Sequence, residues 1–183
     1  MSNELNGNGV MSAVKTNVGF SGTQSGMSWN QKANLVQFLR LHKCIAFAHG
    51  DCSGADAEAH KIVEKYFEAL LANDEHCEPK IVVHPAVNPV KRAYTLGRKN
   101  EFLVGGYIQD GIIYEQTSPA KYLDRNKRIV DTTDILLAFP KEQEMTLRSG
   151  TWATIRYAWS QVSRTGKKVI VVPPQGRIIE IKE

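Results

Sequence analysis

Four stretches of the sequence are rich in glycine, hydroxyl side chains and arginine, the residue types that bind anionic groups. Their candidate ligand-binding residues are Ser21, Gly22, Thr23, Gln24, Gly50, Asp51, Ser53, Gly54, Asp56, Arg125, Asn126, Arg148, Ser149, Gly150 and Thr151. Glycine lets backbone N–H groups approach a phosphate, hydroxyls add donors, and arginine adds a bidentate charge. A glycine-rich turn taken alone is more often just a tight turn, and the other residues could serve as a helix cap or a solvated helix face. The prediction of a phosphate site therefore depends on several stretches meeting in one place.

The order of apolar runs along the chain predicts that they do meet. One predicted strand ends at Phe20, and the others cover 44–48, 80–84, 134–139 and 167–172, with a weaker edge strand over 177–182. Predicted helices cover 30–42, 55–71, 121–131 and 150–163. Strands that are apolar on both faces and separated by helices indicate a parallel sheet covered on both sides. We therefore expect an α/β fold, a Rossmann-like three-layer sandwich with a central parallel sheet of about five strands. In such a sheet the loops that follow the strands share the carboxyl edge, where ligands bind.

One segment, 97–120, departs from this alternation. Asp110-Gly111 lies between two short apolar runs, a strong signal for a two-residue hairpin turn. We expect a hairpin insertion around residues 105–116. It could form a lid over the site, or be a surface excursion or an oligomer contact.

Length and composition limit the function classes. The 183 residues fit one domain, which we place at 15–183 as a nucleotide-binding domain after a flexible tail at 1–14. The three cysteines are an odd number without C-x-x-C spacing, which argues against a disulfide framework or a zinc site and indicates a cytoplasmic protein. No apolar run approaches 18 residues, so no membrane partner is expected. The net charge of +4 suits a small anionic ligand but is not the clustered basic charge typical of nucleic-acid binding, so nucleic acid is not the expected partner.

The stretches GFSGTQSG, FAHGDCSGADAEAH, YLDRNKRIVDTTDILLAFP and LRSGTWATIRYA resemble the SLOG superfamily. This Rossmann-like group includes DprA/Smf proteins, LOG phosphoribohydrolases and molybdenum-cofactor carrier proteins. The resemblance runs from about Thr16 to Pro173 and leaves 97–120 uncovered. It implies that strand one is central and that a nucleotide, a nucleotide derivative or a phosphorylated cofactor binds over the loops named above. It also implies a homo-oligomer, a dimer or higher.

One position departs from the LOG pattern. The phosphate turn of LOG enzymes carries a catalytic glutamate, and Thr154 stands at the matching position here. Gly150 and Thr151 match the phosphate grip, but a hydroxyl cannot act as a carboxylate base near neutral pH. Phosphate binding therefore transfers from the resemblance, whereas N-glycoside hydrolysis does not. Asp51 is a weak candidate for a relocated catalytic carboxylate, and a role in orienting its own turn is the favoured interpretation.

Three functions follow from the sequence. The first is a binding module that holds a nucleotide-like ligand as a sensor, carrier or sequestering protein. The alternative is a LOG-like phosphoribohydrolase that acts on a nucleoside monophosphate or related nucleotide, and a second alternative is DprA-like binding of single-stranded DNA. No cofactor is certain. No metal site is predicted, although magnesium could accompany a phosphate. Trp29, close to the first stretch, could stack on a base.

Overall fold

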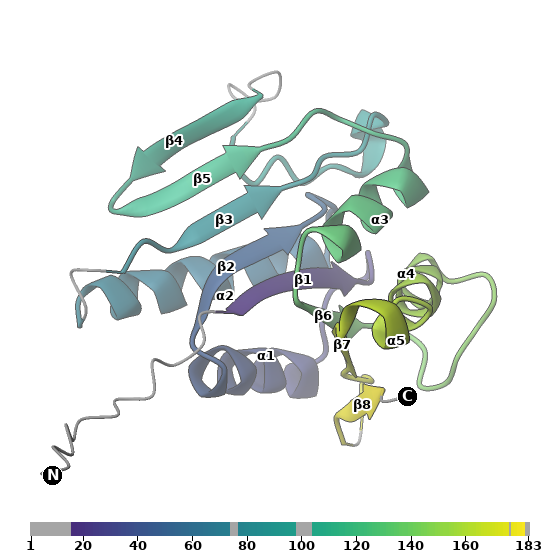
Figure 1. Cartoon of the computed structure of the whole chain (residues 1–183). Coiled ribbons are helices and arrows are strands. Elements are labelled where there is room, and N and C mark those ends of the chain that lie inside the picture. The colour runs from purple at the N-terminus through teal and green to yellow at the C-terminus, as the bar shows by residue number, and fades with distance from the viewer. Residues whose placement is uncertain (1–15, 74–76, 98–103, 176, 182–183) are drawn as a thin grey trace, which may run out of the picture.

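The computed structural model describes residues 16–73, 77–97, 104–175 and 177–181. The tail predicted at 1–14 lies outside these residues. The described strands form one eight-stranded sheet in the order β4-β5-β3-β2-β1-β6-β7-β8 (Figure 1). They are β1 (Thr16–Gly22), β2 (Cys44–His49), β3 (Lys80–Val83), β4 (Gly105–Gln109), β5 (Ile112–Gln116), β6 (Ile135–Phe139), β7 (Lys168–Val171) and β8 (Ile179–Ile181). The helices are α1 (Trp29–Leu41), α2 (Ala55–Leu71), the 3-10 turn η1 (Pro89–Lys91), α3 (Tyr122–Asp131), α4 (Gly150–Trp159) and α5 (Val162–Thr165).

The sheet is parallel through its centre. Strands β5, β3, β2, β1, β6 and β7 pair in parallel, and β4 and β8 are antiparallel at the two edges. Strand β1 lies between β2 and β6, as the family resemblance implies. The Rossmann-like sandwich is therefore confirmed, with a sheet wider than the predicted five strands. The edge strand predicted over 177–182 is also present, as β8.

Helices cover both faces of the sheet (Figure 1). Helices α1 and α2 lie on one face over the larger core, to which Phe20, Phe47 and Phe67 belong. Helix α4 covers the other face over β6 and β7, where Trp152 and Ile155 are buried. The buried positions of α2 recur every four residues, which explains why its bounds are readable from the sequence.

The predicted hairpin is present, but it is not a lid. Asp110 and Gly111 both have positive φ, +50° and +80°, as the favoured two-residue hairpin turn requires. Strand β5 then pairs in parallel with β3, with Tyr114 opposite Ile81. The hairpin therefore extends the sheet at its edge.

The single helix predicted over 150–163 is wrong. Helix α4 ends at Trp159, and α5 begins at Val162. The hydroxyl of Ser160 donates to the carbonyl of Tyr157, and such local side-chain bonds compete with helical backbone bonds. In the part of the chain that the structure describes, no helix is long and apolar enough to cross a membrane.

Candidate functional site

The predicted loops meet at the carboxyl edge through direct contacts. The loops after β1 and β2 are joined by a hydrogen bond from Ala55 N–H to Thr23 O, 2.9 Å long. Gly54 has φ +87°, and a Cβ there would lie 2.2 Å from the carbonyl oxygen of Gln24. A Cβ on Gly22 would lie 2.4 Å from that of Ala55. Glycine is therefore required at both positions by close approach of the chain itself.

The loop after β2 also packs against α3 through Arg125. The guanidinium is buried, with 3% of the residue exposed, and it lies so close to Gly50 that a Cβ there would be 0.9 Å from Nη1. Its Nη2 donates to Cys52 Sγ at 3.1 Å, and its Cζ lies 4.9 Å from the centre of the Tyr122 ring. Arg125 therefore makes its contacts inside the protein at this edge, although its Nε has no hydrogen-bond partner among the described residues.

Asp56 occupies the place in this loop that a bound anion would take. Its Oδ2 accepts hydrogen bonds from the N–H groups of Gly50 and Cys52, both at 3.1 Å, and lies 3.7 Å from Arg125 Nη1. Burial raises the pKa of Asp56, while Arg125 and the two N–H donors act in the opposite direction. Two amides of this glycine-rich turn therefore donate to a carboxylate of the chain itself, while the first N–H of α2, that of Ala55, donates to Thr23 O.

Asp51 is likewise held inside the protein. Its Oδ2 accepts from Arg92 Nε at 2.9 Å, and its Oδ1 accepts from both the N–H and the hydroxyl of Thr95 at 2.9 Å. The residue is 1% exposed and has φ +56°. This arrangement fastens the segment after η1 to the loop, and it favours the turn-orienting interpretation of Asp51 over the catalytic one.

Asn126 and Thr154 tie α3 to α4. Asn126 Nδ2 donates to Thr154 Oγ1 at 2.7 Å, and that hydroxyl donates to the carbonyl of Gly150 at 3.0 Å. Both side chains are buried. The residue at the position of the LOG glutamate is thus a structural link between two helices.

The start of α4 has no acidic side chain in its first turn, in contrast to the start of α2. Thr151 is buried there, and a Cβ on Gly150 would lie 3.2 Å from Cε1 of Tyr122. Ser149 Oγ accepts from Trp152 N–H at 3.5 Å, whereas the N–H groups of Gly150 and Thr151 have no partner inside the helix. The helix dipole favours negative charge at this end. Arg148, just before the helix, is exposed, and so is Lys121 at the start of α3. Helix α4 follows β6, which lies next to β1 where the strand order reverses, the usual ligand position in this architecture.

The first loop closes largely on itself. Thr23 Oγ1 accepts from Ser25 N–H at 3.3 Å, and Thr23 O accepts from Gly26 N–H at 3.3 Å. Ser21 is buried, whereas Gln24 in this loop and Ser53 in the next are exposed. Of the predicted residues here, Gln24 and Ser53 are therefore the ones whose side chains face solvent.

A buried histidine network lies beneath the second loop. His49 Nδ1 accepts from Asp51 N–H at 3.1 Å, His49 Nε2 lies 2.9 Å from His60 Nδ1, and His60 Nε2 lies 3.2 Å from Glu64 Oε1. Burial and the neighbouring His60 lower the pKa of His49 well below its usual value. The network steadies the turn at Asp51. His60 and Glu64 stand four residues apart on α2, a visible signal, but their partner His49 is remote in the sequence.

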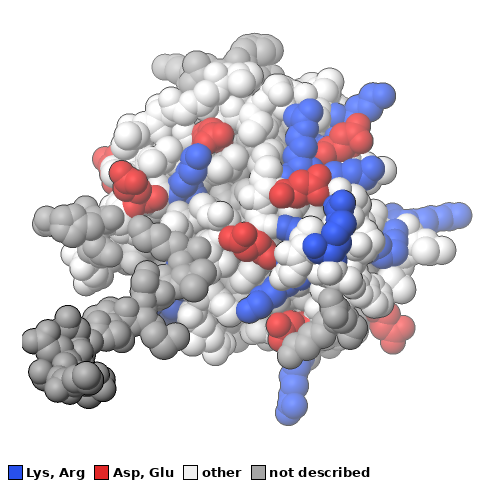
Figure 2. Space-filling model, in the orientation of Figure 1, with Lys and Arg blue, Asp and Glu red and all other residues white. Residues whose placement is uncertain are grey.

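Basic side chains gather at this edge. Figure 2 shows Lys and Arg concentrated on the side toward which β1, β2, β3 and β5 run in Figure 1. Four exposed basic residues lie in segments that follow strands at this edge: Lys91, Lys121, Lys141 and Arg148. The mild overall positive charge thus has a local focus.

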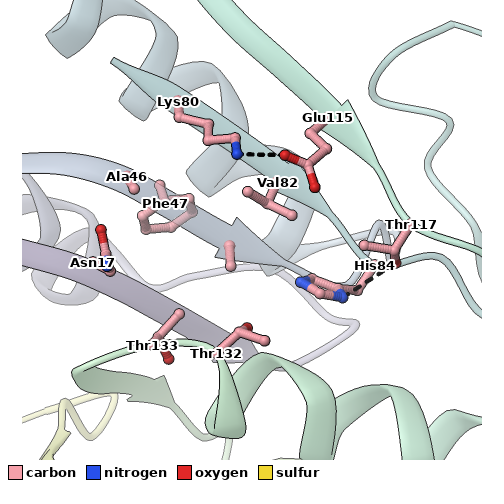
Figure 3. Close-up of a pocket in the computed structure, with 11 residues that line it drawn as sticks. Asn17, Ala46, Phe47, Lys80, Val82, His84, Glu115, Thr117, Thr132 and Thr133 are labelled. Atoms are coloured by element: carbon pink, nitrogen blue, oxygen red, sulfur yellow. Dashed lines mark hydrogen bonds and ion pairs between the residues drawn. The ribbon is translucent and has the colours of Figure 1, made fainter. Parts of the chain in front are cut away.

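A cavity of about 270 Å³, which the sequence did not predict, lies on the sheet face beside α3 (Figure 3). Its floor includes Ala46, Ala48 and Val82 of β2 and β3, and His84 and Thr117 stand at its carboxyl end. None of the residues that line it comes from the start of α4.

Comparison with known proteins gives one informative match. No family model matches the sequence, and no curated protein matches it. Among solved structures the chain is similar to DNA processing protein A from Helicobacter pylori, described as having a unique single-stranded DNA binding mode. The TM-score is 0.51 at 18% identity, over 86% of this chain and 65% of that protein. The chain therefore spans just under two thirds of that protein's length.

This match corrects one prediction. The modest net charge predicted that nucleic acid is not the partner, but a solved protein of this fold binds single-stranded DNA. Net charge is a sum over the whole surface, whereas a nucleic-acid strand contacts only one side of a protein. The net charge therefore does not show whether basic residues lie together on one side. The likeness shows the Rossmann-like fold and nothing finer.

Proposed function

We propose that this protein binds single-stranded DNA along the carboxyl edge of its sheet. The observation that carries the proposal is the start of α4, which has no acidic residue in its first turn and follows exposed Arg148. A phosphate at this position would receive backbone donors, the helix dipole and a guanidinium. Half or more of the hydrogen bonds from proteins to DNA are made to phosphate and sugar, so this set of donors suits the backbone of a DNA strand.

The spread of exposed cations along the edge favours a DNA strand over an enclosed small molecule. Pockets for small ligands bury most of the ligand surface. Here the first two loops close on themselves, and the exposed cations are spread over the segments after β3, β5 and β6. Trp29, at the start of α1 beside the first loop, is 85% exposed. Exposed aromatic rings beside a basic surface are the usual stacking platforms for single-stranded nucleic acid.

The structural neighbour supports the same proposal. DNA processing protein A binds single-stranded DNA, and it shares the fold with this chain. Transfer of that activity to this chain is part of the proposal, since the likeness covers 65% of that protein.

A free nucleotide is the second candidate, favoured by one observation. Arg125 Nε is buried without a partner among the described residues, and Arg125 lies over Tyr122, whose ring contacts Gly150. A single phosphorylated ligand at the start of α4 would lie close to this unused donor. Its binding would extend the SLOG resemblance to a ligand of the nucleotide type.

The test is fluorescence anisotropy with a labelled single-stranded oligonucleotide and the matching duplex at two salt concentrations. If the four exposed cations each contact a phosphate, the logarithm of affinity should fall with the logarithm of salt with a slope of about 2.8. Raising salt from about 50 to about 200 mM should then weaken single-strand binding roughly 50-fold. Adenosine monophosphate as a competitor distinguishes the second candidate, which predicts displacement at low nucleotide concentration.

Two variants locate the contact. Ser149→Asp keeps a helix-capping oxygen but adds negative charge, and it should weaken DNA binding about tenfold because a charge at a helix end contributes up to about 2 kcal/mol. Arg148→Ala should lower the salt slope by about 0.7. Arg40→Ala is the matched control, since Arg40 is exposed in the last turn of α1 at the opposite edge. Salt-independent binding, or equal effects of Arg40→Ala and Arg148→Ala, would contradict the proposal.

A further inference from the structure

The cavity beside α3 has a flat, apolar floor and walls whose charges cancel. Small side chains of β2 and β3, Ala46 and Val82 among them, form the floor. Lys80 and Glu115 form an ion pair on one side, and Thr132, after the end of α3, stands on the other (Figure 3). At about 270 Å³ the cavity is just below the usual range for small-ligand sites, which begins at about 300 Å³. It therefore suits a flat, uncharged ring.

His84 supplies an unused polar atom at the carboxyl end of the cavity. The residue is 3% exposed, its Nδ1 lies 3.2 Å from Thr117 Oγ1, and its Nε2 has no hydrogen-bond partner among the described residues. Burial, with Arg125 and Arg128 nearby, lowers the pKa of His84 to about 4, so the ring is neutral at pH 7. Thr117 donates its own hydrogen to Val83 O and can accept the one on Nδ1. His84 Nε2 then carries a lone pair that calls for a donor.

The cavity is connected to the start of α4 through α3. The charge of Arg125 acts on His84, and the Arg125 guanidinium lies over the ring of Tyr122. That ring in turn contacts the position of Gly150. Tyr122 and Arg125, about one turn apart on α3, thus link His84 with the helix terminus proposed to hold a phosphate.

We infer that this cavity holds one unstacked nucleobase with an exocyclic amino group, which excludes thymine, from the DNA strand bound at the carboxyl edge. The inference rests on the proposed function and specifies which part of the strand enters the protein. A nucleobase is flat and uncharged, and its amino group is a donor for His84 Nε2. Thymine has no amino group, and its one ring donor, N3–H, lies between two carbonyl oxygens that would repel the lone pair of Nε2, so the site disfavours thymine at that position. Bases of single strands are readily splayed out and read in this way.

The first experiment uses nucleosides, which have no phosphate. The full chain is titrated with cytidine and with thymidine while the Cε1–H signal of His84 is followed by NMR, with His84→Gln for assignment. Cytidine should shift this signal, and thymidine should bind at least about threefold more weakly, since it lacks the amino donor. Absence of a shift with cytidine would overturn the inference. So would a His84 signal that moves with protein concentration alone, because a second copy would then fill the cavity.

The second experiment fills the cavity. Ala46→Phe places a ring on its floor, and Ala33→Phe places the same ring on the exposed side of α1. Ala46→Phe should lower affinity for oligo-dC about tenfold without changing the salt slope, as expected for loss of one held base with all phosphate contacts retained. Equal affinities of the two variants would overturn the inference while leaving the proposed function intact. Failure of the proposed function differs, since no oligonucleotide then binds to wild type, whatever cytidine does to His84.

Discussion

Replacing Asp56 should destabilise the protein more than any other single change to a polar side chain at the carboxyl edge. The residue is 3% exposed, and its carboxylate accepts hydrogen bonds from two backbone N–H groups and faces the buried guanidinium of Arg125. Asp56→Ala leaves those donors without an acceptor and leaves a buried positive charge without its counterion. Asp56→Asn keeps an oxygen in place and removes only the charge.

The expected magnitude follows from these contacts. Removing one partner of a buried ion pair costs about 3–5 kcal/mol, a range that already includes part of the loss from unpaired hydrogen-bond donors. A protein of this size changes its Tm by roughly 2–4 °C per kcal/mol, so Asp56→Ala should lower the Tm by about 6–20 °C. Asp56→Asn should lose about half as much free energy, since one acceptor remains.

The assay is urea unfolding followed by circular dichroism, with and without added phosphate. If Asp56 fills an anion position, inorganic phosphate should restore part of the stability of Asp56→Ala and have less effect on wild type, because a ligand that binds only the folded state stabilises it. Asp124→Ala removes an exposed carboxylate of α3 and serves as the control, with an expected change within about 0.5 kcal/mol.

Two results would refute this account of Asp56. A loss below about 1 kcal/mol in Asp56→Ala would mean that Gly50, Cys52 and Arg125 do not depend on the carboxylate. Equal phosphate effects on wild type and Asp56→Ala would mean that the loop offers no anion position when the side chain is removed.

Three further predictions concern other parts of the same edge. The free energy of unfolding should be constant above about pH 7 and fall as the pH is lowered toward 5, because folding lowers the pKa of His49 and His84 and the unfolded chain then binds more protons below about pH 6.5. In urea titrations, His84→Gln should reduce the slope of this pH dependence by up to about 1.4 kcal/mol per pH unit. Gly50→Ala should lower the free energy of unfolding by at least about 3 kcal/mol, because its Cβ would lie 0.9 Å from Arg125 Nη1. The double variant with Asp56→Ala should lower it by less than the sum of the two single losses. Trp29→Ala should change the free energy of unfolding by less than about 0.5 kcal/mol, since the side chain is 85% exposed, yet weaken single-strand binding by about 1–3 kcal/mol in the anisotropy assay.

The sequence predicted the elements whose signal is local. Helix α2 has a buried position every fourth residue, and Asp110-Gly111 has the chemistry of its turn, so both were found. The pairing of β5 with β3 was missed, because a short apolar strand that follows a tight turn has the same pattern whether it joins a lid or a sheet. The break between α4 and α5 was missed for a related reason, since its apolar spacing continues past Trp159 while the backbone does not.

The candidate site was predictable as a place but not as a set of contacts. A glycine-rich turn has the same sequence pattern whether its N–H groups face a ligand or a carboxylate of the following helix. Asp56 looks like an ordinary first-turn acid, and its bonds to Gly50 and Cys52 depend on how the loop folds back. The role of Asp51 depends equally on Arg92 and Thr95, which stand more than 40 residues away.

Two helices that begin at the same edge thus have different electrostatic surroundings at their first turns. At the start of α2 the chain supplies its own anion, Asp56, together with the buried cation Arg125, whereas the start of α4 has only the neutral cap Ser149 and exposed Arg148. An external phosphate is repelled from the first position and attracted to the second. Substitutions should then separate into two classes: Asp56→Ala should change stability far more than DNA affinity per folded molecule, and Ser149→Asp should do the reverse. If both variants lowered affinity and stability together, the two helix starts would form one cooperative unit, and the distinction between an internal and an external anion position would not hold.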